Sequence, residues 1–203
     1  MKQRTAGVSR ETKETKIELK VALDGPPECR VATTLPFLDH LLEAFGTHGR
    51  FGLEIEASGD THVDPHHLIE DCGIVLGSAL ARALGDFSGI QRAGCFAFPM
   101  DESLAEVALD LCGRPNLVWK VELGKEPVGT FDPNLARDFM KGLADSLRAT
   151  VHVTLRYSGV ERNDHHALEA IFKALGRALR QAVTRIGTED ILSTKGQIDG
   201  RKT

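Results

Sequence analysis

Apolar and polar residues alternate along several stretches of the chain, a period of two that is typical of strands with one buried face. In residues 16–23, isoleucine, leucine and valine fall on one face, while lysine and glutamate fall on the other. An Asp-Gly-Pro-Pro turn at residues 24–27 ends this stretch. Similar patterns predict further strands, at residues 4–9, 29–33, 51–57, 94–98, 105–111, 117–123 and 151–157.

Four helices are predicted between these strands. The first begins at Pro36, carries apolar residues at helical spacing and ends near Gly46. The third is capped by Asp132-Pro133 and runs to about Leu147. The second and fourth each begin with a pair of adjacent histidines, run to about residues 85 and 186, and are named the His-His helices below.

Each half of the chain has the order β-β-β-α-β-α, which indicates a duplication. Glu169 lies 99 residues after Glu70, and several small and apolar residues that follow Glu70 recur at the same spacing. We therefore predict an α+β fold class, a tandem duplication with two four-stranded sheets and the helices packed between them. Residues 1–88 and 89–203 would form the two repeats of one compact domain, and its pseudo-two-fold axis is expected to bring the His-His helices together.

Composition limits the kinds of binding partner and the cellular compartment that we expect for this chain. The chain has 203 residues, 41% of them hydrophobic, which is enough to build a core. A net charge of -4 with one Trp and one Tyr speaks against nucleic acid as a partner. No apolar stretch reaches the roughly 18 residues of a membrane span, and the N-terminus does not resemble a signal peptide. Four widely spaced cysteines, with Cys72 and Cys95 expected to be buried and reduced, suit a cytoplasmic localisation.

Two His-His-x-x-Glu units carry the candidate chemistry. On a helix, His66 and Glu70 lie four residues apart on one face, whereas His67 points about 100° away, so adjacent histidines tend to serve different sites. Imidazole with carboxylate suits manganese, iron or zinc better than calcium or magnesium. One unit alone could be a solvated helix start, but two units favour a metal or catalytic site. The units are Asp64-Pro65-His66-His67-Leu68-Ile69-Glu70-Asp71 and Asn163-Asp164-His165-His166-Ala167-Leu168-Glu169.

Pseudo-symmetry predicts two equivalent metal sites with ligands from both halves. The first helix offers His40, and its counterpart 98 residues later is Asp138. The pairing of the ligands stays open between several alternatives. The preferred assignment places one metal on His66, Glu70, His165 and Asp138, and the other on His67, His166, Glu169 and His40.

These residues and their neighbours closely resemble the imidazoleglycerol-phosphate dehydratase family of histidine biosynthesis. The resemblance covers nearly the whole chain and implies a hydro-lyase that converts imidazole glycerol phosphate to imidazole acetol phosphate and water. It further implies two Mn²⁺ ions per subunit, and trimers that assemble into an octahedral particle with active sites at subunit contacts. The neighbouring motifs are Phe37-Leu38-Asp39-His40, His48-Gly49 and Ser193-Thr194-Lys195-Gly196.

The resemblance also implies roles for individual residues. Asp138 stands where the family usually has a histidine, and a carboxylate can bind manganese well. Glu14 matches the family's proton-transfer carboxylate, while its repeat partner Glu102 is expected to be structural. The implied metal ligands are His40, His66, His67, Glu70, His165, His166 and Glu169. The implied substrate contacts are Arg92, Arg114, Lys195, Ser193 and Thr194 for the phosphate, together with His48.

Two other functions remain open from the sequence. A binuclear metallohydrolase would use the same metal pair to make hydroxide and would release phosphate from esters without dehydration. A non-catalytic assembly or nucleic-acid module is the second alternative, because duplicated α+β units also occur in RNA-associated proteins. The acidic pI of about 6.1 speaks against the latter, and a lack of metal in the purified protein would favour it.

Overall fold

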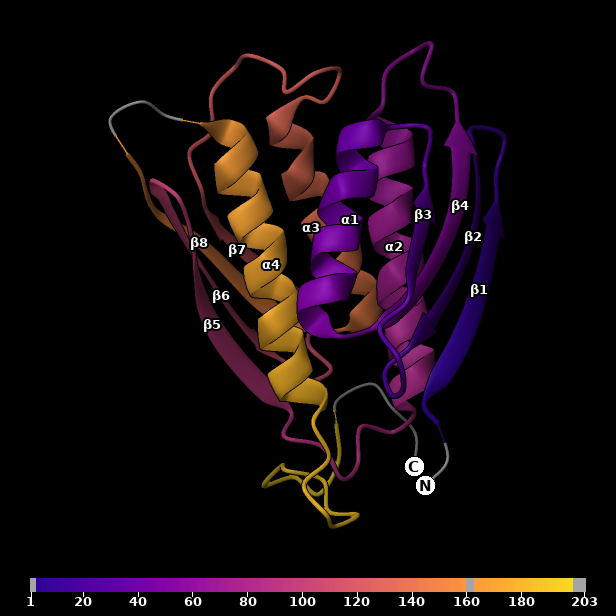
Figure 1. Ribbon diagram of the computed structural model, residues 1–203. Coiled ribbons are helices and arrows are strands. Elements are labelled where there is room, and N and C mark those ends of the chain that lie inside the picture. Colours follow the sequence, from indigo (N-terminus) through magenta and orange to yellow (C-terminus); the bar gives the residue numbers. More distant parts are fainter. Residues whose placement is uncertain (1–2, 160–162, 199–203) are drawn as a thin grey trace.

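Two four-stranded sheets enclose a layer of helices in the computed structural model, which describes residues 3–159 and 163–198 (Figure 1). The first repeat contains, in order, β1 (Thr5–Glu11), β2 (Thr15–Ala22), β3 (Cys29–Ala32), α1 (Pro36–Gly49), β4 (Gly52–Gly59) and α2 (His66–Leu84). The second contains β5 (Ala93–Met100), β6 (Ser103–Asp110), β7 (Asn116–Lys120), the 3₁₀ turn η1 (Pro133–Leu135), α3 (Ala136–Leu147), β8 (Thr150–Ser158) and α4 (Asp164–Val183). This order confirms the predicted duplicated α+β fold.

The two sheets share one topology. Their strand orders are β1-β2-β4-β3 and β5-β6-β8-β7, and only the last pair in each sheet is parallel. The register repeats at one end of the central strand pairs, where Thr15 pairs with Gly59 in the first sheet and Ser103 pairs with Ser158 in the second. Beyond this end the pairing of the second sheet shifts by one residue, between Leu104 and Ala105. Residues of the turns at this end can therefore be compared directly between the two repeats.

Alternation along the strands places their apolar faces against the helices. In β2, Ile17, Leu19 and Val21 are buried, and the residues between them are exposed. In β6, Ala105, Val107 and the residues two positions on either side are buried in the same way. The helical layer fills the space between the sheets, so the apolar faces of both repeats meet in one core (Figure 1).

The helices pair across the two repeats. Among the described residues, α2 packs mainly against α3, and α1 packs mainly against α4. Each His-His helix, α2 or α4, therefore lies against the first helix of the other repeat. The expectation that the two His-His helices meet each other was wrong, since the pseudo-symmetry exchanges the pairs α2–α3 and α4–α1.

Glycines let the paired helices approach closely. A Cβ atom on Gly73 of α2 would lie 2.2 Å from the carbonyl oxygen of Phe139 on α3. At the other crossing, a Cβ atom on Gly176 of α4 would lie 2.4 Å from the carbonyl oxygen of Phe45 on α1. Both distances are far below van der Waals contact, so the backbones pack where a side chain would separate them.

We expect Gly73→Ala to lower the free energy of unfolding by about 1–3 kcal/mol, the usual cost of overpacking a core. The added methyl group would push α3 away from α2, and urea denaturation would measure the loss. Gly7→Ala is the matched control, because its added Cβ meets its nearest neighbour at an ordinary 3.6 Å. Equal stability of both variants would show that the close α2–α3 approach contributes nothing.

Several predicted boundaries move by a few residues. Asp132 does cap a helical segment, since its Oδ1 accepts a hydrogen bond from the Asn134 amide at 2.9 Å, but the capped segment is η1. Helix α1 continues to Gly49, and α4 ends at Val183 because Thr184 adopts an extended conformation. Strand β7 ends at Lys120, so the alternation that follows it does not form a strand. The division of the chain at residue 88 stays a prediction.

Burial of the cysteines follows the expectation only in part. Cys72 is buried, whereas Cys95 is exposed on β5. Alternate residues of β5 face α4, and Cys95 lies on the opposite face of the strand. The small residues beside Cys95 in the sequence therefore did not indicate that its side chain is buried. Within the described part of the chain, no helix combines the length and apolar character needed to cross a membrane.

Candidate active site

All four helices begin at the same end of the helical layer (Figure 1). This arrangement brings the starts of the His-His helices near the first turns of α1 and α3. His40 lies in the second turn of α1, and Asp138 lies in the first turn of α3. Because α4 packs on α1 and α2 packs on α3, the candidate ligands form two separate groups of side chains.

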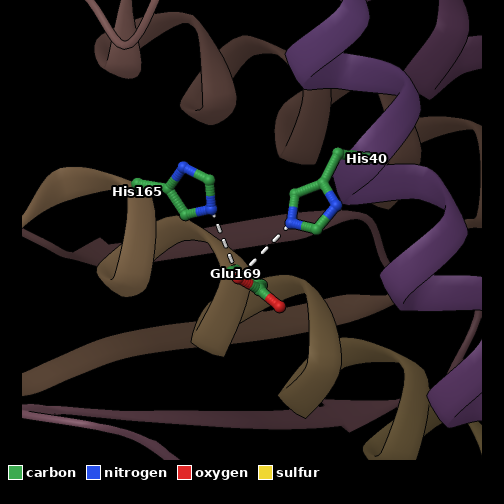
Figure 2. Close-up of side chains that lie close together, drawn as sticks. All are labelled: His40, His165 and Glu169. Atoms are coloured by element: carbon green, nitrogen blue, oxygen red, sulfur yellow. Dashed lines mark ion pairs between the residues drawn. The ribbon is translucent and has the colours of Figure 1, made fainter.

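The first group joins α1 to α4 (Figure 2). His40 Nε2 and His165 Nε2 lie 3.3 and 3.4 Å from the same oxygen, Glu169 Oε2. Glu169 is 7% exposed, and the Nε2 atom of His40 is buried against its carboxylate. Two imidazole nitrogens and a carboxylate oxygen that converge in this way can hold a divalent cation.

The second group joins α2 to α3. His66 Nε2 lies 3.7 Å from Glu70 Oε2, and His66 Nδ1 lies 3.5 Å from Asp138 Oδ2. Asp138 thus occupies the place that His40 takes in the first group, as the spacing between the repeats predicts. These three side chains are between 31% and 43% exposed, so this group is more open to solvent than Glu169.

The grouping differs from the assignment preferred from sequence. His165 lies beside His40 and Glu169, not beside His66. The remaining histidines, His67 and His166, lie against carboxylates outside the helices, in the segment between β4 and α2 and in the turn between β5 and β6 respectively. Among the described residues, His67 also groups with Glu14 and Asp60, and His166 groups with Asp101 and Glu102.

His67 is held by Asp60, a residue that the sequence analysis did not single out. The Nδ1 atom of His67 lies 3.1 Å from Asp60 Oδ2 and 3.9 Å from Glu14 Oε2. The hydrogen bond with Asp60 raises the pKa of His67 above its ordinary value. When Nδ1 bonds to a carboxylate, the neutral ring leaves Nε2 free to bind a metal.

His166 is held in a different way. Its Nδ1 atom lies 3.0 Å from Oε2 of Glu102, and its Nε2 atom lies 3.7 Å from Asp101. The hydrogen bond with His166 lowers the pKa of Glu102. Glu102 was expected to be structural, yet it contacts a candidate ligand. Its place 88 residues after Glu14, in the equivalent turn, was the available signal.

Gly159 explains why the two turns differ. It stands where the first repeat has Asp60, 99 residues earlier. A Cβ atom on Gly159 would lie 2.7 Å from Cβ and Cγ of Glu102, and the backbone has a φ of +65°. The absent side chain leaves room for Glu102 to reach His166, so one carboxylate serves this imidazole in place of Asp60.

Lys173 was also missed by the sequence analysis. Its Nζ lies 2.6 Å from Oε1 of Glu169, one helical turn away, and both side chains are largely buried. Burial acts to raise the pKa of the Glu169 carboxyl and is the largest single effect, but the contacts with Lys173 and His40 together outweigh it, and the pKa is lowered. The spacing Glu169-x-x-x-Lys173 is a helical ion-pair pattern that could have indicated this contact.

His48 lies apart from both groups. It is eight residues after His40, about 12 Å along α1 at 1.5 Å per residue, and it packs edge-on against Phe98 with ring centroids 5.0 Å apart. Burial lowers its pKa, and the nearby charges of Lys173 and Arg177 lower it further. The structure therefore favours a neutral His48.

The proposed phosphate-binding residues meet at the opposite end of the molecule. They line one pocket of about 600 Å³. The segment that follows α4, which supplies part of this lining, lies at the end of the molecule opposite the helix starts (Figure 1). Arg92 is fixed there by Asp110, at 2.7 and 2.9 Å, and by a hydrogen bond to the Leu192 carbonyl. From His165 to Val183, α4 alone spans about 27 Å. The lining residues include Arg92, Arg114, Ser193, Thr194 and Lys195.

The fold and the grouped histidines and carboxylates define a duplicated α+β enzyme with a candidate metal centre. The sequence pattern of the family described as imidazoleglycerol-phosphate dehydratase matches residues 33–179. The chain belongs to the imidazoleglycerol-phosphate dehydratase family. Membership confirms the expected class, a hydro-lyase of histidine biosynthesis.

Individual relatives agree over almost the whole chain. The imidazoleglycerol-phosphate dehydratase of Citrifermentans bemidjiense is 49% identical over 198 residues, which cover 96% of this chain and 99% of the relative. That of Geobacter sulfurreducens is 47% identical over 197 residues, with the same coverage. Among solved structures, the Staphylococcus aureus enzyme superposes with a TM-score of 0.79 at 38% identity, covering 89% of this chain and 99% of that one. The Pyrococcus furiosus enzyme gives a TM-score of 0.80 at 36% identity, with 94% and 100% covered.

Proposed function

We propose that this chain dehydrates imidazole glycerol phosphate to imidazole acetol phosphate, and that it does so with two Mn²⁺ ions per subunit. Family membership supports the reaction. The metal requirement rests on one observation, the convergence of the Nε2 atoms of His40 and His165 on one oxygen of the buried Glu169 carboxylate. Imidazole nitrogens and a carboxylate oxygen directed at one point form a donor set for a divalent transition metal.

The side chains present suit manganese. Each group combines imidazole nitrogen with carboxylate oxygen, and the Nε2 atoms of His67 and His166 would complete the ligand sets. Asp138 supplies an anionic oxygen in place of the family's usual histidine, which keeps a donor at this position. When bound, the metals would act as Lewis acids that polarise the substrate.

Glu14 is the proposed group that moves the carbon-bound proton. Its side chain is 56% exposed, and its carboxylate lies 3.9 Å from His67 Nδ1. Asp60 already provides the close hydrogen bond to that nitrogen. The Glu14 carboxylate is thus beside the candidate metal ligands without being needed to orient one, which suits a general base.

The distance between the candidate metal ligands and the phosphate pocket within one chain supports active sites at subunit contacts. A small phosphate ester cannot reach both the metal groups and the phosphate pocket of one chain, because α4 alone spans about 27 Å between them. The pocket of one subunit would therefore face the metal groups of another. We propose a homo-oligomer on this ground, with trimers that form an octahedral particle, as in the resemblance drawn from sequence. Four free thiols suit the reducing cytoplasm.

Adding manganese back to metal-stripped protein tests the function directly. Dehydration should rise to a plateau near two bound metals per chain. Asp138→Ala should reduce the metal bound at limiting manganese, because it removes a ligand from the group on α2 and α3. Two metals without dehydration but with phosphate release would favour the hydrolase alternative. Full activity of the stripped protein would disprove the metal requirement.

A further inference from the structure

A buried carboxylate of α2 contacts the residues on either side of the turn between β1 and β2, which carries Glu14. Asp71 of α2 is 8% exposed. Its Oδ2 accepts a hydrogen bond of 2.5 Å from the hydroxyl of Thr15, and its Oδ1 lies 3.0 Å from Nε of Arg10. Asp71 therefore contacts both strands on either side of the turn, directly next to Glu14.

Hydrogen bonds of the backbone also hold the turn between β1 and β2 in place. The Glu14 amide donates to Thr12 Oγ1 at 3.1 Å, and the Glu14 carbonyl accepts from the amide of Asp60 at 3.0 Å. Thr12 and Thr15 also bond to each other through the amide of Thr12, at 2.9 Å. The main chain of Glu14 is thus fixed on both sides, while its side chain extends into solvent.

The second repeat builds the equivalent turn without this carboxylate. Phe98, Ser103 and Ala170 stand at the positions of Arg10, Thr15 and Asp71. Ser103 shares a hydrogen bond with the hydroxyl of Ser158 at 3.0 Å. The fold of the turn therefore does not require the buried charge. Burying a carboxylate costs free energy because the charge loses its hydration. At this position, only the repeat whose turn carries Glu14 has such a buried carboxylate.

We propose that Asp71 is a positioning residue for the dehydration, which holds the Glu14 turn against α2 through Thr15 and Arg10. This inference rests on the proposed role of Glu14 in proton transfer. A proton-transfer group must stay within hydrogen-bond reach of its substrate, and a displacement of about 1 Å can cost on the order of 100-fold in rate. Asp71 acts through the turn and does not itself touch the substrate.

Thr15→Val removes the hydroxyl while keeping the side-chain shape, so it tests the contact without leaving a cavity. In manganese-loaded protein we expect kcat to fall at least about 10-fold, with KM and bound metal per chain unchanged. Thr15→Ser keeps the hydroxyl and should restore most of the rate. Ile17→Val is the control for stability, since it removes a buried methyl group from β2 and should leave kcat unaltered.

A double variant separates this inference from the role of Glu14. If Asp71 acts through Glu14, adding Thr15→Val to Glu14→Gln should slow the reaction no further. An equal slowing in both backgrounds, or an undiminished kcat of Thr15→Val beside a slow Glu14→Gln, would overturn the positioning role alone. An undiminished rate for Glu14→Gln would overturn the proton-transfer role, and the positioning role with it.

Discussion

Replacing His166 by alanine should lower kcat at least roughly 1,000-fold, which corresponds to about 4 kcal/mol of activation free energy. Glu102 binds Nδ1 of this ring at 3.0 Å, so Nε2 is the nitrogen left to bind a metal. Its loss would remove one ligand from a small set and should also weaken assembly if the metal centres lie at subunit contacts. The measurement is kcat at saturating manganese, with bound metal and molar mass determined on the same sample.

His152→Ala is the matched control for that experiment. His152 is an exposed histidine on β8, it belongs to neither group of candidate ligands, and its removal should leave kcat and bound metal unaltered. Full activity of His166→Ala would refute the assignment of two metal sites per chain. A loss of activity in both variants would show that His152 serves the site, as a substitute for the family's missing histidine would.

Replacing Glu14 by glutamine should slow turnover by about 10²- to 10⁴-fold, the usual contribution of a general acid or base. The amide keeps the size of the side chain and can still form hydrogen bonds, but it cannot take up the proton. Substrate affinity and bound manganese should remain at the values of the unmodified protein. Single-turnover kinetics and calorimetric titration with substrate would separate the chemical step from binding.

The repeat partner of Glu14 provides a sharp comparison. Glu102→Gln should act through His166, because the loss of an orienting carboxylate commonly reduces metal affinity by about 10- to 100-fold. Excess manganese should therefore rescue Glu102→Gln and should not rescue Glu14→Gln. Rescue of both variants would assign Glu14 to metal binding and remove it from proton transfer.

Sequence periodicity was sufficient to predict the fold and its duplication, but it did not identify the helix partners. Alternation along β2 and the repeated residues after Glu70 and Glu169 reflect burial, which each element shows by itself. Which helix packs against which depends on shapes across the core. The deciding contacts include Gly73 against Phe139, and these residues are 66 positions apart in the chain.

The candidate site was predictable where its residues share a helix. The four-residue spacing of His66 and Glu70 places them on one face, and the spacing between repeats indicated Asp138 as the counterpart of His40. The contacts of Asp60 and Glu102 with the histidines were not predicted. Glu102 reaches His166 only because the folded sheet brings the β5–β6 turn to the start of α4, over a separation of 64 residues. Asp60 lies seven residues before His67, in the segment between β4 and α2, where no regular spacing indicates the contact.

The glycine at position 159 makes the difference between the two repeats hard to reverse. Installing an aspartate there, as in the first repeat at Asp60, would place a side chain in the space that Glu102 occupies and on a backbone with positive φ. Removing Glu102 first would leave His166 without its orienting carboxylate. Neither substitution alone therefore restores the arrangement of the first repeat, because the two histidines depend on carboxylates from different segments of the chain.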